Sequence, residues 1–227
     1  MNVAPIFAAA TWIVPLVIAI TFHEVAHGVV ANAFGDPTAR DAGRLSFNPI
    51  RHVDPVGTVI LPLILAVTGA PVFGWAKPVP VRMGQLRNPR WQGLLVSAAG
   101  PGMNFLLAIV GAAILSVILR LTIADHRGTA VLFLLVNLNN FMMVNLFLAI
   151  FNLLPIPPLD GGAVLARLLP GRIGRRFAMM GRYGFGILIF LLVALPMAMP
   201  QFDPVSQLVQ PPVRFLARTL FNLFMGH

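Results

Sequence analysis

The stretch PLVIAITFHEVAHGVVANAFG, residues 15–35, decides the class of fold. It continues an apolar run that begins near the N-terminus, yet it carries His23, Glu24 and His27. On a helix, side chains four residues apart project from one face and are separated by about 6 Å along the axis. The two imidazoles can therefore hold one metal ion, and Glu24, the only glutamate in the chain, lies between them.

The composition around this stretch is that of a membrane protein. Of the 227 residues, 58% are hydrophobic and 10% are charged, and the mean hydropathy is +0.85, values outside the range of soluble domains. A full membrane span needs about 20 apolar residues. The apolar stretches are 3–22, 57–73, 93–119, 129–154, 184–199 and, more weakly, 205–225. We therefore expect an all-α polytopic membrane protein with four to six membrane helices.

One membrane-embedded domain over residues 1–227 is the simplest organisation. The sequence shows no internal repeat, low-complexity tract or long linker that would separate a second folded unit. No basic segment or cleavage motif accompanies the first apolar run, so we expect this run to remain in the mature protein. We expect the helix that carries HEVAH to run from about residue 7 to Phe34, with Gly35 as its cap.

The net charge of +9 indicates a membrane surface and not a nucleic acid. The basic residues lie in short loops between apolar stretches, without a basic domain or interleaved aromatic residues. Loops 35–56, 74–92 and 155–182 hold 12 of the 16 Lys and Arg residues. Since cytoplasmic loops are enriched in these residues, we expect all three loops on the cytoplasmic side of the cell membrane.

Loops 35–56 and 74–92 can lie on the same side of the membrane only if the stretch between them, 57–73, re-enters the membrane instead of crossing it. The stretch is short and contains glycine and proline, and broken backbone is tolerated at membrane depth where protein buries it. Re-entry and crossing both stay open. We expect a small re-entrant or β-strand element between the HEVAH helix and the third apolar stretch.

Zinc is the metal that the HEVAH pattern favours. In the pattern His-Glu-x-x-His the histidines ligate zinc and the glutamate activates water. The structural alternative is that these residues are interior polar groups of a helix bundle, but ionisable groups in a membrane helix are costly, which favours a function. Because the chain has no cysteine, a third protein ligand must be a histidine or a carboxylate.

Several side chains are candidates for the third ligand. They are Asp36, Asp41, His52, Asp54, Asp125, Asp160 and Asp203. Asp160 differs from the others because it follows a Pro-rich break in FNLLPIPPLDGG, residues 151–162, where an apolar stretch ends and a new helix begins. Prolines stop the helix, and two glycines permit close approach beside the carboxylate. By itself this pattern fits a metal ligand and a helix-capping aspartate equally well.

Taken together, these motifs resemble the site-2 protease family of intramembrane zinc metalloproteases. The resemblance rests on HEVAH at 23–27 and on Asn-x-x-Pro-x-Pro-x-Leu-Asp-Gly at 152–161, with further likeness in GRLSFNPIRHVDPVGT (43–58), FGWAKPVPV (73–81) and AAGPGMN (98–104). It covers about residues 16–165. The chain resembles small bacterial members, and we expect it to lack the PDZ or CBS modules of other members.

The resemblance implies an enzyme that hydrolyses peptide bonds within or near the transmembrane segments of membrane proteins. It implies one zinc ion held by His23, His27 and Asp160, with Glu24 as the general base. It also implies that Asn152 holds the substrate backbone. The expected catalytic core is about 7–165, followed by C-terminal helices at 166–227. The expected partners are the lipid bilayer and single-pass membrane proteins or signal-peptide-like segments, with no nucleic acid.

Other functions and roles stay open beside this one. A membrane transporter for metal ions or a catalytically silent membrane-protein binder could also use His and Asp at a broken helix. The segment FGWAKPVPV either docks an extended substrate along its edge or forms an interfacial loop. His52 is either a gating residue or a hydrogen-bonded loop histidine, and Gly100 and Asn104 are expected to serve helix packing. Residues 205–225 either lie on the interface or complete a last pass.

Overall fold

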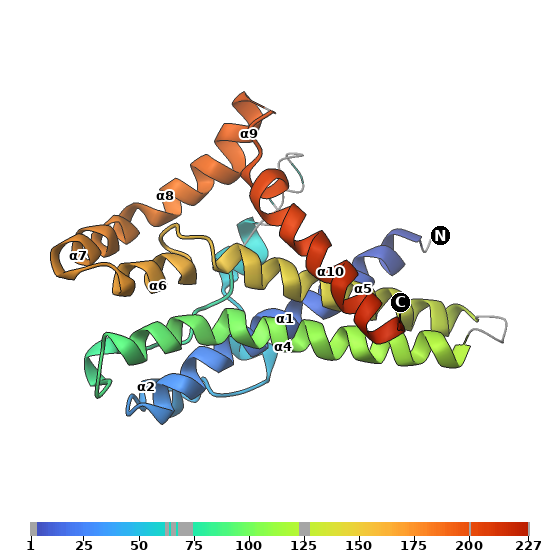
Figure 1. Cartoon of the computed structure of the whole chain (residues 1–227), viewed down its shortest axis with the longest axis horizontal. Coiled ribbons are helices and arrows are strands. Elements are labelled where there is room, and N and C mark those ends of the chain that lie inside the picture. The colour runs from blue at the N-terminus through green and yellow to red at the C-terminus, as the bar shows by residue number, and fades with distance from the viewer. Residues whose placement is uncertain are drawn as a thin grey trace.

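The computed structural model is helical wherever it has regular structure (Figure 1). It describes residues 4–61, 64, 67, 75–122, 128–199 and 201–226, without the side chains of 4–10 and 59. Four helical segments among these residues are long and apolar enough to span a membrane: Thr11–Ala33, Trp91–Thr122, Thr129–Asn152 and Gly171–Ala198. The prediction of an all-α multi-pass membrane protein is thereby confirmed, at the lower end of the predicted number of helices.

The predicted element after the first helix is described only in part. Most of residues 62–74, which include the predicted re-entrant stretch, lie outside the described residues. Before them, Pro55–Ile60 forms a π-helix (η2), and after them residues 75–82 have no regular secondary structure. The part of this element that the structure describes thus contains no β-strand, because the polar groups of its backbone bond to other partners.

Three long helices form the centre of the bundle. Helices α1 (Ala4–Ala33), α4 (Trp91–Thr122) and α5 (Thr129–Asn152) pack against one another. Small side chains on α4 allow this approach, since Ala108 and Ala112 are fully or almost fully buried in the core. Close packing of small residues is the usual way in which membrane helices associate.

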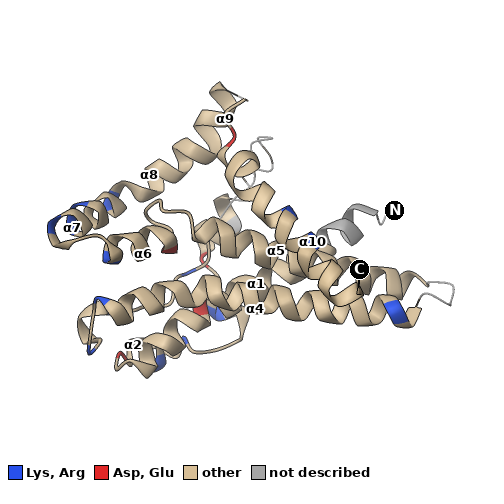
Figure 2. Ribbon diagram, viewed as in Figure 1, with Lys and Arg blue, Asp and Glu red and all other residues tan. Residues whose placement is uncertain are grey.

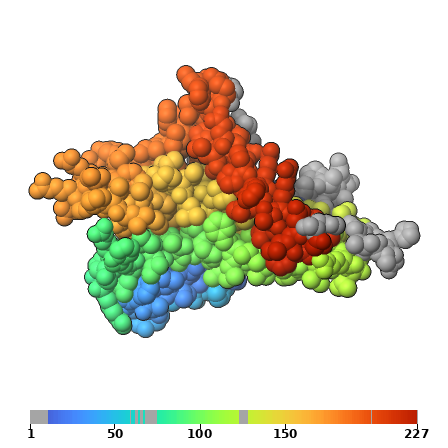
Figure 3. Space-filling model, in the orientation of Figure 1, coloured from blue at the N-terminus to red at the C-terminus, as the bar shows by residue number. Residues whose placement is uncertain are grey.

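The C-terminal helix joins this core. Helix α10 (Gln210–Met225) lies across α4 and α5 (Figure 3), with Val213 and Ala217 buried against them. Its 16 residues are fewer than the 20 or so that a full span needs. The predicted helix at 205–225 therefore packs on the bundle as a short element, preceded by the π-helix Val205–Val209 (η6).

The segment between the core and α10 is a broken series of helices. It comprises α6 (Asp160–Leu168), α7 (Gly171–Met179), η4 (Met180–Tyr183), α8 (Gly184–Ile189), η5 (Phe190–Ala194) and α9 (Leu195–Ala198). The predicted loop 155–182 is thus largely helical. Only 6% of the apolar window in Gly171–Ala198 is buried inside the protein, against 44% in α1, so this candidate span packs little against the rest of the chain.

Basic side chains gather at one end of the molecule. Figure 2 shows most of the Lys and Arg around α2 (Thr38–Asp41), α7 and the start of α4, with fewer at the far end of α4 and near α10. Helix α1 points its C-terminus towards this end (Figure 1). As expected, α1 stops beside Gly35, whose φ of +104° is the left-handed conformation that glycine adopts readily.

Asp36 ties the end of α1 to the extended segment 75–82. Its carboxylate is fully buried and accepts hydrogen bonds from the backbone N–H and hydroxyl of Thr38 and, at 2.6 Å, from the backbone N–H of Arg82. Burial by itself raises the pKa of Asp36, but the bonds from Thr38 and Arg82 outweigh it, so the pKa lies below its ordinary value.

The other end of the extended segment is held by the loop that follows α2. The guanidinium of Arg44 donates to the carbonyl of Lys77 at 2.7 Å, and the N–H of Lys77 donates to the carbonyl of His52 at 2.9 Å. His52 ends the short 3-10 helix Pro49–His52 (η1), and its ring Nε2 bonds the carbonyl of Ser46 at 2.8 Å. These contacts agree with the interpretation of His52 as a hydrogen-bonded loop histidine.

We expect Asp36→Asn to destabilise the protein by about 1–3 kcal/mol near neutral pH, because the new amide cannot accept both sets of hydrogen bonds. A carboxylate with a lowered folded-state pKa contributes stability above the pKa of the unfolded chain and loses it as pH falls through the folded-state value. The difference from wild type should therefore shrink below about pH 4. Thermal unfolding in detergent between pH 3 and 7 measures it.

Asp41→Asn is the matched control, because the Asp41 carboxylate is exposed and its ion pair is with neighbouring Arg40. Exposed pairs of this kind contribute little. A deficit of Asp36→Asn that stays constant over the whole pH range would contradict the assigned role of the carboxylate.

Candidate functional site

The two histidines of HEVAH face the interior of the bundle. His23 is 7% exposed, and its Nε2 lies 3.1 Å from the Nε2 of His27. The four-residue spacing on α1 produces this arrangement, as the sequence predicts.

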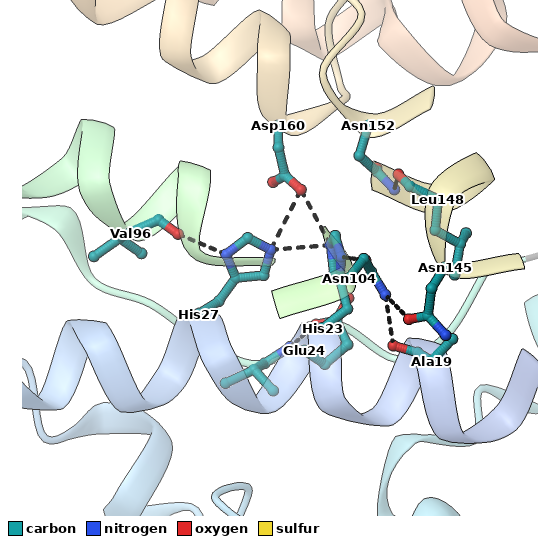
Figure 4. Close-up of polar contacts among 11 residues, drawn as sticks. Ala19, His23, Glu24, His27, Val96, Asn104, Asn145, Leu148, Asn152 and Asp160 are labelled. Carbon is teal, nitrogen blue, oxygen red and sulfur yellow. Dashed lines mark hydrogen bonds and ion pairs between the residues drawn. The ribbon is translucent and has the colours of Figure 1, made fainter. Parts of the chain in front are cut away.

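Asp160 brings a carboxylate to the same point from another helix (Figure 4). Its Oδ2 lies 3.1 Å from His23 Nε2 and 3.3 Å from His27 Nε2. Among the described residues, His23, His27 and Asp160 are the only group of three His, Asp or Glu side chains close enough to share a metal ion. Of the other candidates for a third ligand, Asp125 lies outside the described residues.

The spacing of the three donor atoms fits zinc. Donors at about 2.0–2.2 Å from a zinc ion in tetrahedral geometry lie about 3.3–3.5 Å from one another. The three donor-to-donor distances here are 3.1, 3.1 and 3.3 Å, which is close to the distances expected around a zinc ion. Two imidazoles and one carboxylate also form a donor set of the kind that catalytic zinc uses, with a fourth position open for water.

Gly100 makes room for the imidazoles. A Cβ atom at this position of α4 would lie 2.4 Å from His27 Nε2 and 2.6 Å from His23 Nε2. Real Cβ contacts are never that short, so any side chain larger than hydrogen would push the histidines out of place. Helix α4 can therefore pass beside the candidate metal centre only because residue 100 is glycine.

Helix α4 also supplies hydrogen-bond partners for the Nδ1 atoms of His23 and His27. The Nδ1 of His23 lies 2.6 Å from Asn104 Oδ1, and the Nδ1 of His27 lies 2.6 Å from the carbonyl oxygen of Val96. Both partners are acceptors, so each Nδ1 carries a proton and donates it. With a proton on Nδ1, Nε2 of each ring is the nitrogen that points towards Asp160 and can ligate a metal ion.

The break before α6 positions Asp160. The chain turns at residues 153–158, and the first turn of α6 packs directly on that backbone. A Cβ at Gly161 would lie 2.2 Å from the carbonyl oxygen of Leu153, and a Cβ at Gly162 would lie 2.7 Å from the nitrogen of Pro157. The two glycines therefore allow the contact that places the Asp160 carboxylate over the histidines.

Glu24 lies beside the cluster on α1. One oxygen of its carboxylate accepts a hydrogen bond of 2.8 Å from the backbone N–H of Val79, in the extended segment 75–82. The contact fixes the carboxylate next to the histidines without making it a member of the three-residue cluster.

A cavity of about 290 Å³ connects these groups. Its walls include the cluster, Glu24 and Asn152, with apolar side chains of the extended segment and of α4. The amide of Asn152 donates to the carbonyl of Leu148 at 3.0 Å. An amide carries two N–H groups and one carbonyl oxygen, so bonding capacity remains for a ligand in the cavity.

Sequence reasoning missed two parts of this site. Gly100 and Asn104 were expected to serve helix packing, whereas the structure places both against the imidazoles. The signal that could have found them is the segment AAGPGMN, which carries them in one helix turn and was already part of the family resemblance. The contact of Val79 with Glu24 has no signal in the sequence, because it uses a backbone group.

We expect Gly100→Ala to remove most of the bound zinc, because the new methyl group displaces both imidazoles. Gly102→Ala is the matched control: it lies on the same helix, gains the same helix propensity, and its Cβ would have no atom within 4 Å. Metal analysis of the two purified variants measures the difference. Equal zinc contents in both variants would show that Gly100 does not shape the metal centre.

Comparison with known proteins agrees with this site. The model of peptidase family M50 matches residues 11–131 and 120–195. YwhC of Bacillus subtilis is 38% identical over 185 residues, which cover 80% of this chain and 79% of YwhC. Rip2 of Mycolicibacterium smegmatis is 32% identical over 190 residues, which cover 83% of this chain and 67% of Rip2. Both relatives are provisionally named zinc metalloproteases.

No solved structure matches the chain. The family match spans most of the sequence, including HEVAH and the segment of Asp160. It favours hydrolysis over the transport and binding alternatives, and zinc follows from the family together with the His-His-Asp cluster. The chain therefore belongs to peptidase family M50, the site-2 protease family, and is an intramembrane zinc metalloprotease.

Proposed function

We propose that His23, His27 and Asp160 hold the zinc ion, that Glu24 is the general base, and that Asn152 binds the substrate backbone. The observation that supports this most directly is the approach of the three donor atoms to within 3.3 Å of one another, on the wall of a cavity that also exposes Glu24. Zinc, when bound, supplies Lewis-acid activation of water and of the peptide carbonyl.

Glu24 handles the proton in this proposal. Its carboxylate takes a proton from the attacking water as the new C–O bond forms, and it returns that proton to the leaving amine as the C–N bond breaks. The hydrogen bond from the Val79 N–H occupies one carboxylate oxygen. The second oxygen is then the atom that exchanges the proton, and the bond to Val79 keeps it turned towards the cavity.

Asn152 is suited to hold an unwound substrate. Peptide bonds in a helix are closed to attack, because each N–H and C=O is bonded within the helix. A substrate must therefore open locally, and the exposed backbone then needs partners inside the membrane. The remaining N–H and carbonyl oxygen of the Asn152 amide can supply them on the cavity wall.

The extended segment 75–82 offers a second surface for that backbone. Pro78, Val79 and Val81 line the cavity. The N–H groups of Lys77 and Val79 are already bonded, and the prolines have none. An extended substrate lying along residues 77–80 would therefore meet carbonyl acceptors and no free N–H group, and it would bond to these carbonyls through its own N–H groups.

The family cleaves membrane proteins, and we propose single-pass proteins or signal-peptide-like segments as the substrates of this member. Such a segment has the length and apolar character to reach a cavity within a helix bundle. We further propose that residues 1–227 form one domain in the cell membrane with the catalytic core at 7–165. The basic end formed by α2, α7 and the start of α4 (Figure 2) supports a cytoplasmic location for the nearby active site.

We expect Glu24→Gln to lower cleavage of a single-pass substrate by about 10²–10⁴-fold while the enzyme keeps its zinc, because the base is lost but the amide oxygen still accepts from Val79. Asp160→Ala should lose both cleavage and zinc, because it removes a proposed ligand. Cleavage in liposomes and metal analysis of the same preparations measure the two effects. Asp41→Ala, which removes an exposed carboxylate, should leave both unchanged.

Two results would overturn parts of this assignment. Full zinc in Asp160→Ala would move the third ligand to another residue. Near wild-type cleavage by Glu24→Gln would exclude Glu24 as the base.

The proposed orientation predicts which residues a membrane-impermeant maleimide reaches. The chain has no cysteine, so single cysteines act as unique labels. Ile50→Cys and Arg172→Cys should react from the cytoplasmic face, in inverted vesicles, whereas Thr129→Cys at the start of α5 should react only in right-side-out vesicles. Labelling of Ile50→Cys from the same side as Thr129→Cys would contradict the orientation.

A further inference from the structure

Two asparagines are the only side chains among the described residues of the membrane helices that combine an amide with complete burial. Asn104 on α4 and Asn145 on α5 are both 0% exposed. Asn104 contacts His23, but Asn145 touches neither the three-residue cluster nor the cavity wall. A buried amide has to find partners for its polar atoms, and the partners of Asn145 lead back to the metal centre.

The contacts form a directed chain. The Nδ2 of Asn145 donates to the backbone carbonyl of Phe141 at 2.8 Å, so its Oδ1 points the other way, towards Asn104. That Oδ1 accepts from Asn104 Nδ2 at 2.9 Å, and the same Nδ2 also donates to the carbonyl of Ala19 at 3.2 Å. The Oδ1 of Asn104 is then left to face His23 Nδ1 at 2.6 Å (Figure 4).

In this series of hydrogen bonds, the donor and acceptor ends of one amide determine which end of the next amide donates and which accepts. An asparagine amide has a donor end and an acceptor end of nearly the same shape, so it can rotate by half a turn unless its partners distinguish the two ends. A rotated Asn104 would present N–H groups to His23 Nδ1. The ring would then accept at Nδ1 and carry its proton on Nε2, the nitrogen that faces Asp160.

We propose that Asn145 is a positioning residue that holds Asn104 with its oxygen towards His23 and thereby keeps a ring proton on Nδ1, so that Nε2 is the nitrogen available to the metal ion. This inference rests on the proposed role of His23 as a zinc ligand. The inference gives Asn145 a function in the metal centre although it reaches His23 only through Asn104. Asn145 lies on α5, whose only other contribution to the site is Asn152 on the cavity wall.

Asn145→Leu tests the relay, because leucine has a similar size and no acceptor. Partners in the shell behind metal ligands typically change metal affinity 10–100-fold, and we expect about a tenfold loss for this more distant residue. Competition with a chelator in detergent measures the zinc affinity of the full chain. Asn145→Asp retains an oxygen for Asn104 and, when protonated, a donor for Phe141, so it should stay within about threefold of wild type.

Asn140→Leu is the matched control. Asn140 lies on the same helix, is also buried, and donates to the backbone carbonyl of Thr11 at 3.0 Å, which is not part of the hydrogen-bonded series that leads to His23. Both leucine variants lose a buried amide that connects α5 to its neighbours, so a merely structural effect would lower zinc affinity equally in the two. Equal losses would overturn the relay. If Asn145→Leu does not fold, Asn145→Ala replaces it, and the same loss of zinc affinity is expected.

The tautomer of His23 provides a second readout, which does not depend on zinc. We expect the ring ¹⁵N shifts of the metal-free protein, assigned with His23→Ala, to report a protonated Nδ1 in wild type and Asn140→Leu, because Nδ1 faces the Asn104 oxygen. Asn145→Leu should add a form in which Nδ1 carries no proton, and an unchanged Nδ1 signal would overturn the inference. Failure of the proposed function looks different: His23→Ala would then bind zinc as tightly as wild type, whatever the tautomer result.

Discussion

The close approach of His23, His27 and Asp160 is the contact around which the rest of the structure is arranged. Three polar side chains meet within 3.3 Å inside a bundle whose other faces are apolar. Ionisable groups at membrane depth are costly unless they are paired or ligate a metal. The surrounding helices must therefore come close enough to enclose these groups and must also supply partners for their remaining polar atoms.

Helix α4 meets both demands with one surface. Gly100 lets its backbone pass beside the imidazoles, while the Val96 carbonyl and the Asn104 side chain bond their Nδ1 atoms. Glycines at the start of α6 play the equivalent part for Asp160. Close approach and hydrogen bonding thus come from the same elements, so that a change of helix position would disturb ligand spacing and ring orientation together.

The segment 75–82, which follows α1 in the chain, links the end of α1 to the wall of the cavity. The segment 75–82 is extended but has no strand partner in the described chain, since its backbone bonds to Asp36, Arg44, His52 and Glu24. One chain segment is therefore connected to the end of the HEVAH helix, to the loop after it and to the proposed base. A displacement of this segment would alter both the cavity wall and the position of Glu24.

The sequence by itself determined the membrane class, the paired histidines, Glu24 and the Asp160 motif, because these depend on composition and on spacing along one chain segment. It also contained Gly100 and Asn104 without indicating what they touch. Only the tertiary structure decided that Gly100 faces the imidazoles, that Val79 contacts Glu24 and that Asn145 accepts a hydrogen bond from Asn104. The physical reason is that these contacts join residues 41 to 81 positions apart, and helix packing, not local pattern, selects which of them meet.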